Sequence, residues 1–352
     1  MMVFSPFLLP PSPIETLPAE LLQEIFILSD LNLALPESSP CISRKLSDPY
    51  IYRFVCNHYF DPGYPRYQKR IYGNPVSQVQ VRRDQSRIFS YRWMTWEIFK
   101  SFILRKYEQS GCLCDKAPGG VAPDTGCPSP QWPPDFEYPT NMVFEGCHKP
   151  ALTSLACPIP QKLLRGPWTK DKLQFLRFLL WTTSMNVNWA GTEACENTRQ
   201  GRREAILERN LEAVQLLNNC RRLCRAPNLD DVRFAVIHGG CDRSIVYDTL
   251  EAVRMWGVAG NAWECGILGL WCGSAIEAGN PKGQWLKLKL EELRSVKSSS
   301  NTRIVHTKPS RMSPRSGDYD HVEDDKLVIA RKRWNGPWPR LSDVLELRSD
   351  GW

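Results

Sequence analysis

The chain has little of what enzyme and membrane sequences usually carry. Among its 352 residues there are five histidines, and none stands in a zinc-protease, nucleophile-elbow or phosphate-loop motif. The longest apolar stretch away from the N-terminus, residues 265–272, is far shorter than the roughly 20 residues that a bilayer span needs. We therefore predict a protein that is not an enzyme, needs no cofactor and has no membrane partner.

The sequence also lacks the pattern of a secreted, disulfide-rich protein. Its 13 cysteines are an odd number spread over a long chain, which is typical of reduced thiols rather than of a disulfide framework. The opening residues, MMVFSPFLLPP, contain no basic group, and prolines interrupt their apolar run. We expect the protein in the cytoplasm, the nucleus or both.

Apolar residues are plentiful. Hydrophobic residues make up 42% of the chain and aromatic residues 11%, with 13 tryptophans. This composition is typical of a globular protein, and the length leaves room for roughly two domains. The pattern along the chain predicts an all-α fold, as the following segments show.

The N-terminal segment IETLPAELLQEIFIL, residues 14–28, predicts a helix with Pro18 in its first turn. Its apolar residues form two neighbouring stripes, Leu17, Leu21, Ile25 and Leu28 on one and Leu22 and Phe26 on the other. A helix that packs on a single core needs one stripe. The second stripe therefore predicts contact with another protein.

Two further short helices are predicted by proline-marked starts. Ser39 precedes Pro40, so its hydroxyl can accept the free amides of a helix that Pro40 begins, with Ile42 and Leu46 on one face. Asp48 and Pro49 repeat the signal. The third helix would carry an apolar stripe of Tyr52, Val55, Cys56 and Tyr59.

Residues 17–26, LPAELLQEIF, and the segment that follows resemble the F-box in the form found in filamentous fungi. The match covers residues 14–57 and departs from the common pattern where Ser39, Pro40 and Leu46 replace a Val-Cys pair and a Trp. The resemblance implies a three-helix module that docks on a Skp-family adaptor and, through it, a cullin. The implied adaptor-binding residues are Leu17, Pro18, Leu21, Leu22, Ile25, Phe26, Leu28, Ile42 and Leu46.

Residues 66–106 are basic and aromatic, with ten Lys or Arg against two acids. Such a composition can indicate a nucleic-acid surface. A helical spacing favours instead one long helix over residues 82–107 with its aromatic side chains buried, and the residues that repeat are Ile88, Tyr91, Thr95, Ile98, Phe102 and Arg105. Nucleic acid is thus not the expected partner.

Residues 108–167 form a Pro-, Gly- and Cys-rich segment with little periodicity, which predicts a long irregular loop. Thiolates and an imidazole in such a loop can hold zinc, although the spacing fits no familiar zinc module. We expect an irregular loop and leave zinc open, the candidate ligands being Cys112, Cys114, Cys127, Cys147, His148 and Cys157.

Residues 168–297 resemble degenerate ankyrin-like repeats. Residues 176–180 with 185–188, residues 210–217, and residues 234–250 are each similar to parts of that helical pair. Val214 lies 32 residues before Val246, and Leu217 lies 33 before Leu250, close to the ankyrin period of about 33. A further pair is expected at 261–278 and 281–297. Stacked helix pairs would offer a surface for another protein.

Two motifs in this region have structural explanations. His238, Gly239, Gly240 and Cys241 could suggest a nucleophile, but paired glycines are typical of a left-handed helix end. Three glycines in the apolar segment 266–273 could suggest a dimer seam, but a close helix crossing within the stack is the simpler explanation, and we expect that crossing.

The predicted organisation is a flexible N-terminus (1–13), an F-box (14–60), a linker and long helix (61–107), the loop (108–167), a solenoid of helical pairs (168–297) and a mostly disordered, charge-rich tail (298–352). We predict a non-catalytic substrate receptor of a cullin-type ubiquitin ligase, with an unidentified protein as its target. The alternative is an interaction scaffold or nuclear regulator that binds an acidic partner or nucleic acid and has no ligase role.

Overall fold

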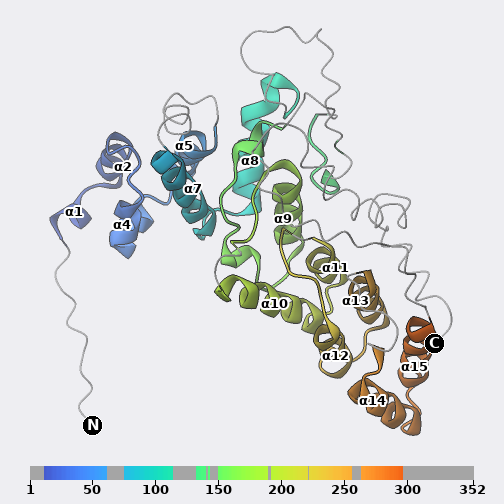
Figure 1. Cartoon of the computed structure of the whole chain (residues 1–352). Coiled ribbons are helices and arrows are strands. Elements are labelled where there is room, and N and C mark those ends of the chain that lie inside the picture. The colour runs from blue at the N-terminus through green and yellow to red at the C-terminus, as the bar shows by residue number, and fades with distance from the viewer. Residues whose placement is uncertain are drawn as a thin grey trace, which may run out of the picture. The chain divides into compact units, whose positions relative to one another are not determined.

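The computed structural model describes residues 12–61, 75–113, 132–139, 142, 150–188, 192–220, 222–255 and 263–295. Its regular structure within these ranges is helical throughout, and they contain no β-strand (Figure 1). One isolated bridge joins Pro158 and Asn186. The predicted all-α class is confirmed.

The chain divides into two compact units. Unit 1 comprises residues 1–111 with 118–120, and unit 2 comprises residues 112–117 and 121–352. No helix in the described ranges has the length and apolarity to cross a membrane. The predicted tail, 298–352, and most of the segment 114–149 lie outside the described residues.

Unit 1 begins with short helices whose starts follow the cap signals. Ser39 accepts the amide of Cys41 at 3.1 Å, and Asp48 accepts that of Tyr50 at 2.7 Å, so α4 and α5 begin where the sequence predicts. The helices are α1 (Pro13–Thr16), α2 (Ala19–Leu28), α3 (Ala34–Ser38), α4 (Pro40–Lys45) and α5 (Pro49–Phe60).

The segment 14–28 is two helices and not one. The chain is extended at Leu17, with ψ 146°, because the residue before a proline is driven out of the helical region. Pro18 stands immediately before α2, and its carbonyl accepts the amide of Leu22 at 3.1 Å. The prediction of one continuous helix is wrong, but the apolar stripes remain on α2.

The predicted long helix 82–107 is also two helices, α7 (Pro75–Ser90) and α8 (Trp96–Tyr107). Tyr91 to Thr95 form the turn between them. The hydroxyl of Thr95 accepts the amide of Ile98 at 3.4 Å and so begins a new helix. The ring of Trp93 within this turn stacks on Tyr52 of α5, with 4.2 Å between ring centroids.

Aromatic side chains fill the core where α5 packs on α7 and α8. The ring of Phe60 lies 4.8 Å from that of Phe89 and about 6 Å from those of Phe99 and Phe102, measured between centroids. All four are buried. Trp96 is buried as well, whereas Tyr91 and Trp93 are half-buried. Most of the described aromatic residues of this basic segment are therefore core residues, as the helical spacing indicated.

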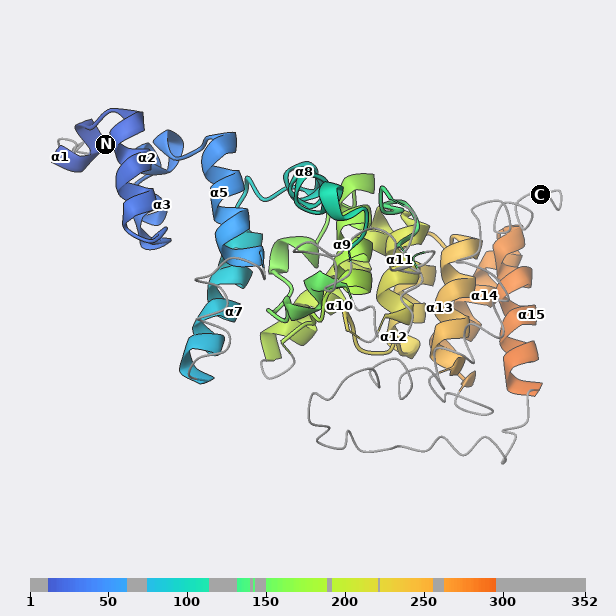
Figure 2. The same cartoon turned by 90° about the horizontal axis from the view of Figure 1, so that it is seen from above.

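Unit 2 is built from helices that lie in rows, with α9, α11, α13 and α15 in one and α10, α12 and α14 in the other (Figures 1 and 2). Within the stack α11 packs on α13, α10 on α12, and α12 on α14. The bounds are α9 (Lys170–Thr182), α10 (Thr192–Leu207), α11 (Leu211–Asn219), α12 (Leu229–Ile237), α13 (Arg243–Met255), α14 (Gly266–Glu277) and α15 (Pro281–Ser295), preceded by short 3-10 turns at Ala151–Ser154 and Gln161–Leu163.

The residues whose spacing suggested a repeat occupy the contact between α11 and α13. Val214 and Leu217 of α11 and Val246 and Leu250 of α13 are all buried, and the two helices pack on each other. Helical pairs with tight turns are thus present where they were predicted, although no finding tests their kinship to ankyrin repeats. Helix α10 was not singled out from the sequence.

A buried ion pair joins α10 to α12. The guanidinium of Arg202 lies 2.8 Å from the carboxylate of Asp231, and both side chains are almost fully buried. The same guanidinium donates to the carbonyl of Leu217 and the thiol of Cys224. These bonds fix how the two helices cross, because a buried charge is tolerated only where its partners are in place.

Candidate protein-docking surface

Helix α2 presents one apolar stripe to its own core and a second to solvent. Leu22 and Phe26 are 0% and 2% exposed. Leu21, Ile25 and Leu28 are 48%, 39% and 78% exposed. We call these three residues the α2 outer stripe. Its apolar area is uncovered within the described part of the chain, which is the arrangement that the two-stripe pattern predicted.

Contacts from α4 hold α2 and the chain before it. The side-chain amide of Gln23 donates to the carbonyl of Lys45 at 3.1 Å. The ammonium of Lys45 donates to the carbonyls of Glu15 at 2.7 Å and Leu17 at 2.5 Å. Because these bonds anchor the bend before α2, the outer stripe is presented on a helix that α4 holds in place.

The turn after α2 is built from left-handed residues. Asp30 and Leu31 have φ angles of 60° and 55°. The amide of Leu31 donates to the carbonyl of Phe26 at 3.0 Å, which closes the helix end as a Schellman motif does. Non-glycine residues are strained in this conformation. The buried side chain of Leu31 and the bond from the Tyr59 hydroxyl to its carbonyl, 3.2 Å, hold it there.

The nine residues predicted to bind the adaptor fall into two groups. Four of them, Leu22, Phe26, Ile42 and Leu46, are buried in the core of unit 1 and are not available to a partner in this conformation. Pro18 and the outer stripe are exposed, and Leu17 is half-buried. The candidate surface is therefore narrower than the sequence indicated.

An ionic contact fastens the short helix α3 to α7. The carboxylate of Glu37 accepts two hydrogen bonds from the guanidinium of Arg87 and one, of 2.8 Å, from the hydroxyl of Tyr91. Arg87 holds the pKa of Glu37 below its ordinary range. Arg87 also donates to the carbonyl of Leu33 at 3.3 Å, so the chain between α2 and α4 is anchored on α7.

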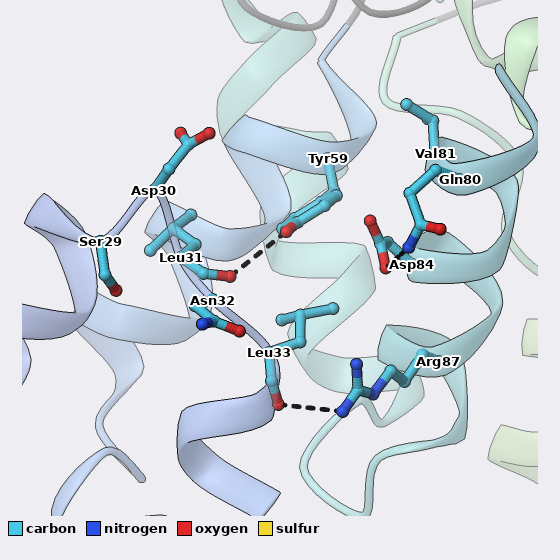
Figure 3. A pocket seen from close by; sticks show the side chains of 10 residues that line it. All are labelled: Ser29, Asp30, Leu31, Asn32, Leu33, Tyr59, Gln80, Val81, Asp84 and Arg87. Atoms are coloured by element: carbon cyan, nitrogen blue, oxygen red, sulfur yellow. Dashed lines mark hydrogen bonds between the residues drawn. The ribbon is translucent and has the colours of Figure 1, made fainter. Parts of the chain in front are cut away.

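A pocket of about 410 Å³ lies beside these anchors (Figure 3). Gln80 and Asp84 of α7 form one wall, and their side chains are joined by a 3.0 Å hydrogen bond. The lining contains no cysteine or histidine. It is lined by Ser29, Asp30, Leu31, Asn32, Leu33, Tyr59, Gln80, Val81, Asp84 and Arg87.

The His-Gly-Gly-Cys motif has the structural role predicted for it. Gly240 and Cys241 are left-handed, with φ of 69° and 51°, and they follow the end of α12 at His238. A Cβ on Gly239 would stand 2.6 Å from the carbonyl oxygen of Ala235. Cys241 is fully buried, and burial raises the pKa of its thiol to about 12, so it is a poor nucleophile.

The zinc hypothesis falls mostly outside the described residues. Cys112 and Cys157 are described and buried, whereas Cys114, Cys127, Cys147 and His148 are not described. Within the described part of the chain, no three His, Cys, Asp or Glu residues are grouped as metal ligands. Zinc binding in the segment 108–167 therefore stays an open hypothesis.

Comparison with known proteins found no family model, no curated protein and no solved structure that matches this chain. The resemblances to the F-box and to ankyrin repeats therefore stay predictions that depend on short motifs. The structural evidence that bears on function is the exposure of the α2 outer stripe.

Proposed function

We propose that the chain is a substrate receptor of a cullin-type ubiquitin ligase, which docks on a Skp-family adaptor through the α2 outer stripe. The observation that carries the proposal is the division of α2 into a core-facing pair, Leu22 and Phe26, and an uncovered stripe of Leu21, Ile25 and Leu28. The F-box resemblance of residues 14–57 supplies the identity of the partner.

The energetics suit a docking helix. Full burial of a leucine or isoleucine contributes roughly 1.5 to 3 kcal/mol, and these three side chains have a large part of that area left to bury. Association costs several kcal/mol, so contacts beyond the stripe are needed for a stable complex. Pro18, exposed directly before α2, and the half-buried Leu17 lie where such contacts would form.

The stacked helix pairs of unit 2 would hold the target. In this role the chain does no chemistry and raises the concentration of the target's lysines near the ligase's transfer enzyme. The Arg202–Asp231 pair, which fixes α10 on α12, favours a rigid surface of this kind. The exposed side chains of these helix pairs would determine which target protein binds.

The test is co-purification of the adaptor with the full chain carrying Leu21→Asp and Ile25→Asp. Two carboxylates would enter an apolar interface unpaired, so we expect at least a hundredfold loss of affinity. Both side chains are partly exposed, and the fold should tolerate the change.

Val79→Asp is the matched control, since Val79 is an apolar residue of α7 in the same unit and is 50% exposed. The control should bind as the native chain does. Full adaptor binding by the double variant would exclude the proposal, and equal loss in the control would assign the effect to unit 1 as a whole. If the native chain co-purifies with another protein and not with the adaptor, the result supports the alternative interpretation, an interaction scaffold without a ligase role.

A further inference from the structure

The last described helix pair leaves an apolar face open. Ile267 and Leu270 of α14 are 50% and 76% exposed, while Leu268 and Cys272 face the core of unit 2. The face also carries Gly266, Gly269 and Gly273, and a Cβ added to any of these would meet nothing within 4 Å. We call these five residues, Gly266, Ile267, Gly269, Leu270 and Gly273, the α14 open face.

These glycines do not serve the close helix crossing that the sequence suggested. The close approach between α14 and α15 is made at Gly283 of α15, where an added Cβ would stand 2.8 Å from that of Ala275. The glycines of α14 instead leave the helix backbone bare beside two large apolar side chains. We expect a flat aromatic ring to pack against this exposed backbone with more contact area than branched leucine side chains would.

Each end of the α14 open face carries an acid. Glu264 and Glu277 are exposed, and neither belongs to an ion pair within the described ranges. Helix α14 itself contains no Lys or Arg. The occupant should therefore be aromatic at its centre and basic at its ends. A second copy of α14 fits poorly, because an antiparallel pair would bring the acids of the two copies together.

One segment of this chain has that composition. Residues 331–340, RKRWNGPWPR, hold four basic residues, no acid, and Trp334 and Trp338 between them. If the segment were extended, as proline-rich chains often are, Trp334 and Trp338 would be about 12 Å apart. Gly266 and Gly273 are about 10 Å apart along a helix. Arg333 and Arg340 would be about 22 Å apart, against about 20 Å for Glu264 and Glu277 if that span were helical throughout.

The segment is also within reach. Helix α15 ends at Ser295, and the guanidinium of Arg294 donates to the carbonyl of Trp263 at 3.5 Å, so the chain leaves α15 beside the start of α14. The 38 residues 296–333 separate this point from Trp334. Such a link spans far more than the face when extended, and it keeps the segment at a high effective concentration.

We propose that residues 331–340 bind the α14 open face of the same chain, with the two indoles on the bare helix backbone and the arginines beside Glu264 and Glu277. The segment would then cover the apolar surface of α14, as a capping repeat covers the end of a solenoid. A protein that needs this face would have to displace it. This inference does not depend on the proposed ligase role.

The test places the photo-crosslinking residue benzoylphenylalanine at Leu270 in the full chain. We expect an intramolecular crosslink whose peptide, identified by mass spectrometry, contains residues 331–340. Leu288 of α15, 49% exposed and outside the α14 open face, is the matched control position and should not crosslink to that peptide. Trp334→Ser with Trp338→Ser should lower the yield from position 270 at least fivefold.

A crosslink between two chains, a crosslink to another part of the chain, or none at all would overturn the proposal. So would a yield that the two tryptophan substitutions leave unchanged. Adaptor binding through α2 should be equal in all of these variants, which separates this test from that of the proposed function.

Discussion

At the scale of single residues, buried charge is what most distinguishes unit 2 from a plain apolar stack. Arg202 is 2% exposed, and the two terminal nitrogens of its guanidinium bond to Asp231, to two backbone carbonyls and to a thiol. This explains why α10 is hard to recognise from sequence. Its inward face carries an arginine and Thr198, also buried, where a periodic apolar pattern would have marked the core.

Asp248 of α13 is a second buried charge, and it makes stability depend on pH. It accepts a hydrogen bond of 2.8 Å from Asn218 of α11, yet burial raises its pKa from the ordinary 3.8 to about 6. Between about pH 4 and pH 6 the folded state therefore binds more protons than the unfolded state. Through this residue, the free energy of unfolding falls as the pH rises across that window.

We predict that Asp248→Asn raises the free energy of unfolding at pH 7, by up to about 3 kcal/mol for two pKa units, and has little effect at pH 4. The asparagine oxygen can still accept the bond from Asn218. Urea unfolding of the native chain and the variant at several pH values checks this, because other carboxylates cancel in the difference. Glu291→Gln, an exposed position on α15, is the control. Identical pH profiles for the native chain and Asp248→Asn would refute it.

At the scale of elements, the sequence predicted the helix starts that follow a capping residue and a proline. It did not predict the breaks between helices within long apolar stretches. Ser39 and Asp48 each sit before a proline and cap α4 and α5 as predicted. The turn between α7 and α8 was missed because Tyr91 and Thr95 happen to continue a helical spacing. Two features lie between the helices. Trp93 stacks on Tyr52, a tertiary contact that the sequence does not reveal, and Thr95 caps α8, a local signal that the helical spacing outweighed.

Close approach at a glycine positions α10 against the segment that precedes α9. A Cβ on Gly201 would stand 1.8 Å from the carbonyl oxygen of Leu164, and the indole of Trp168 donates to the carbonyl of Gly201 at 3.1 Å. This contact depends on distant parts of the chain, so the sequence alone gave no reason to single out Gly201.

We predict that Gly201→Ala lowers the free energy of unfolding by about 1 to 3 kcal/mol, because overpacking outweighs the gain in helix propensity. Glu196→Ala, an exposed position on the same helix, should change it by less than about 0.5 kcal/mol. Urea denaturation of both variants is the measurement. A stabilised Gly201→Ala variant would mean that α10 does not lie against Leu164.

At the scale of the whole molecule, the two-stripe pattern predicted an uncovered apolar face on α2 but not which residues compose it. Leu21 and Leu22 are neighbours of the same type, and the tertiary packing of α2, including that of α4 on it, makes one exposed and the other buried. The α14 open face was harder still, because glycines in an apolar helix are compatible with a crossing inside the stack and with an empty surface. Which of the two holds depends on where α15 packs.

The packing of the aromatic core also decides which fragment of the chain can fold around the candidate docking surface. The compact unit runs to residue 111, past the end of the F-box-like segment at 60. Phe60 is buried against Phe89 and Phe99, and Gln85 of α7 donates to the carbonyl of Tyr59 at 3.0 Å. A fragment that stops at residue 60 would expose Phe60 and lose these partners.

We therefore predict that a fragment of residues 1–111 unfolds cooperatively in urea, whereas residues 1–60 show no sharp transition. Adaptor capture, which needs α2 held in place by α4, should be markedly stronger with 1–111 than with 1–60. Circular dichroism during urea titration and adaptor pull-down at equal fragment concentration measure the two effects. If residues 1–60 unfold at the same midpoint as 1–111, then α7 and α8 contribute nothing to the stability of α2 and α4, and the aromatic cluster around Phe60 is not the core of this unit.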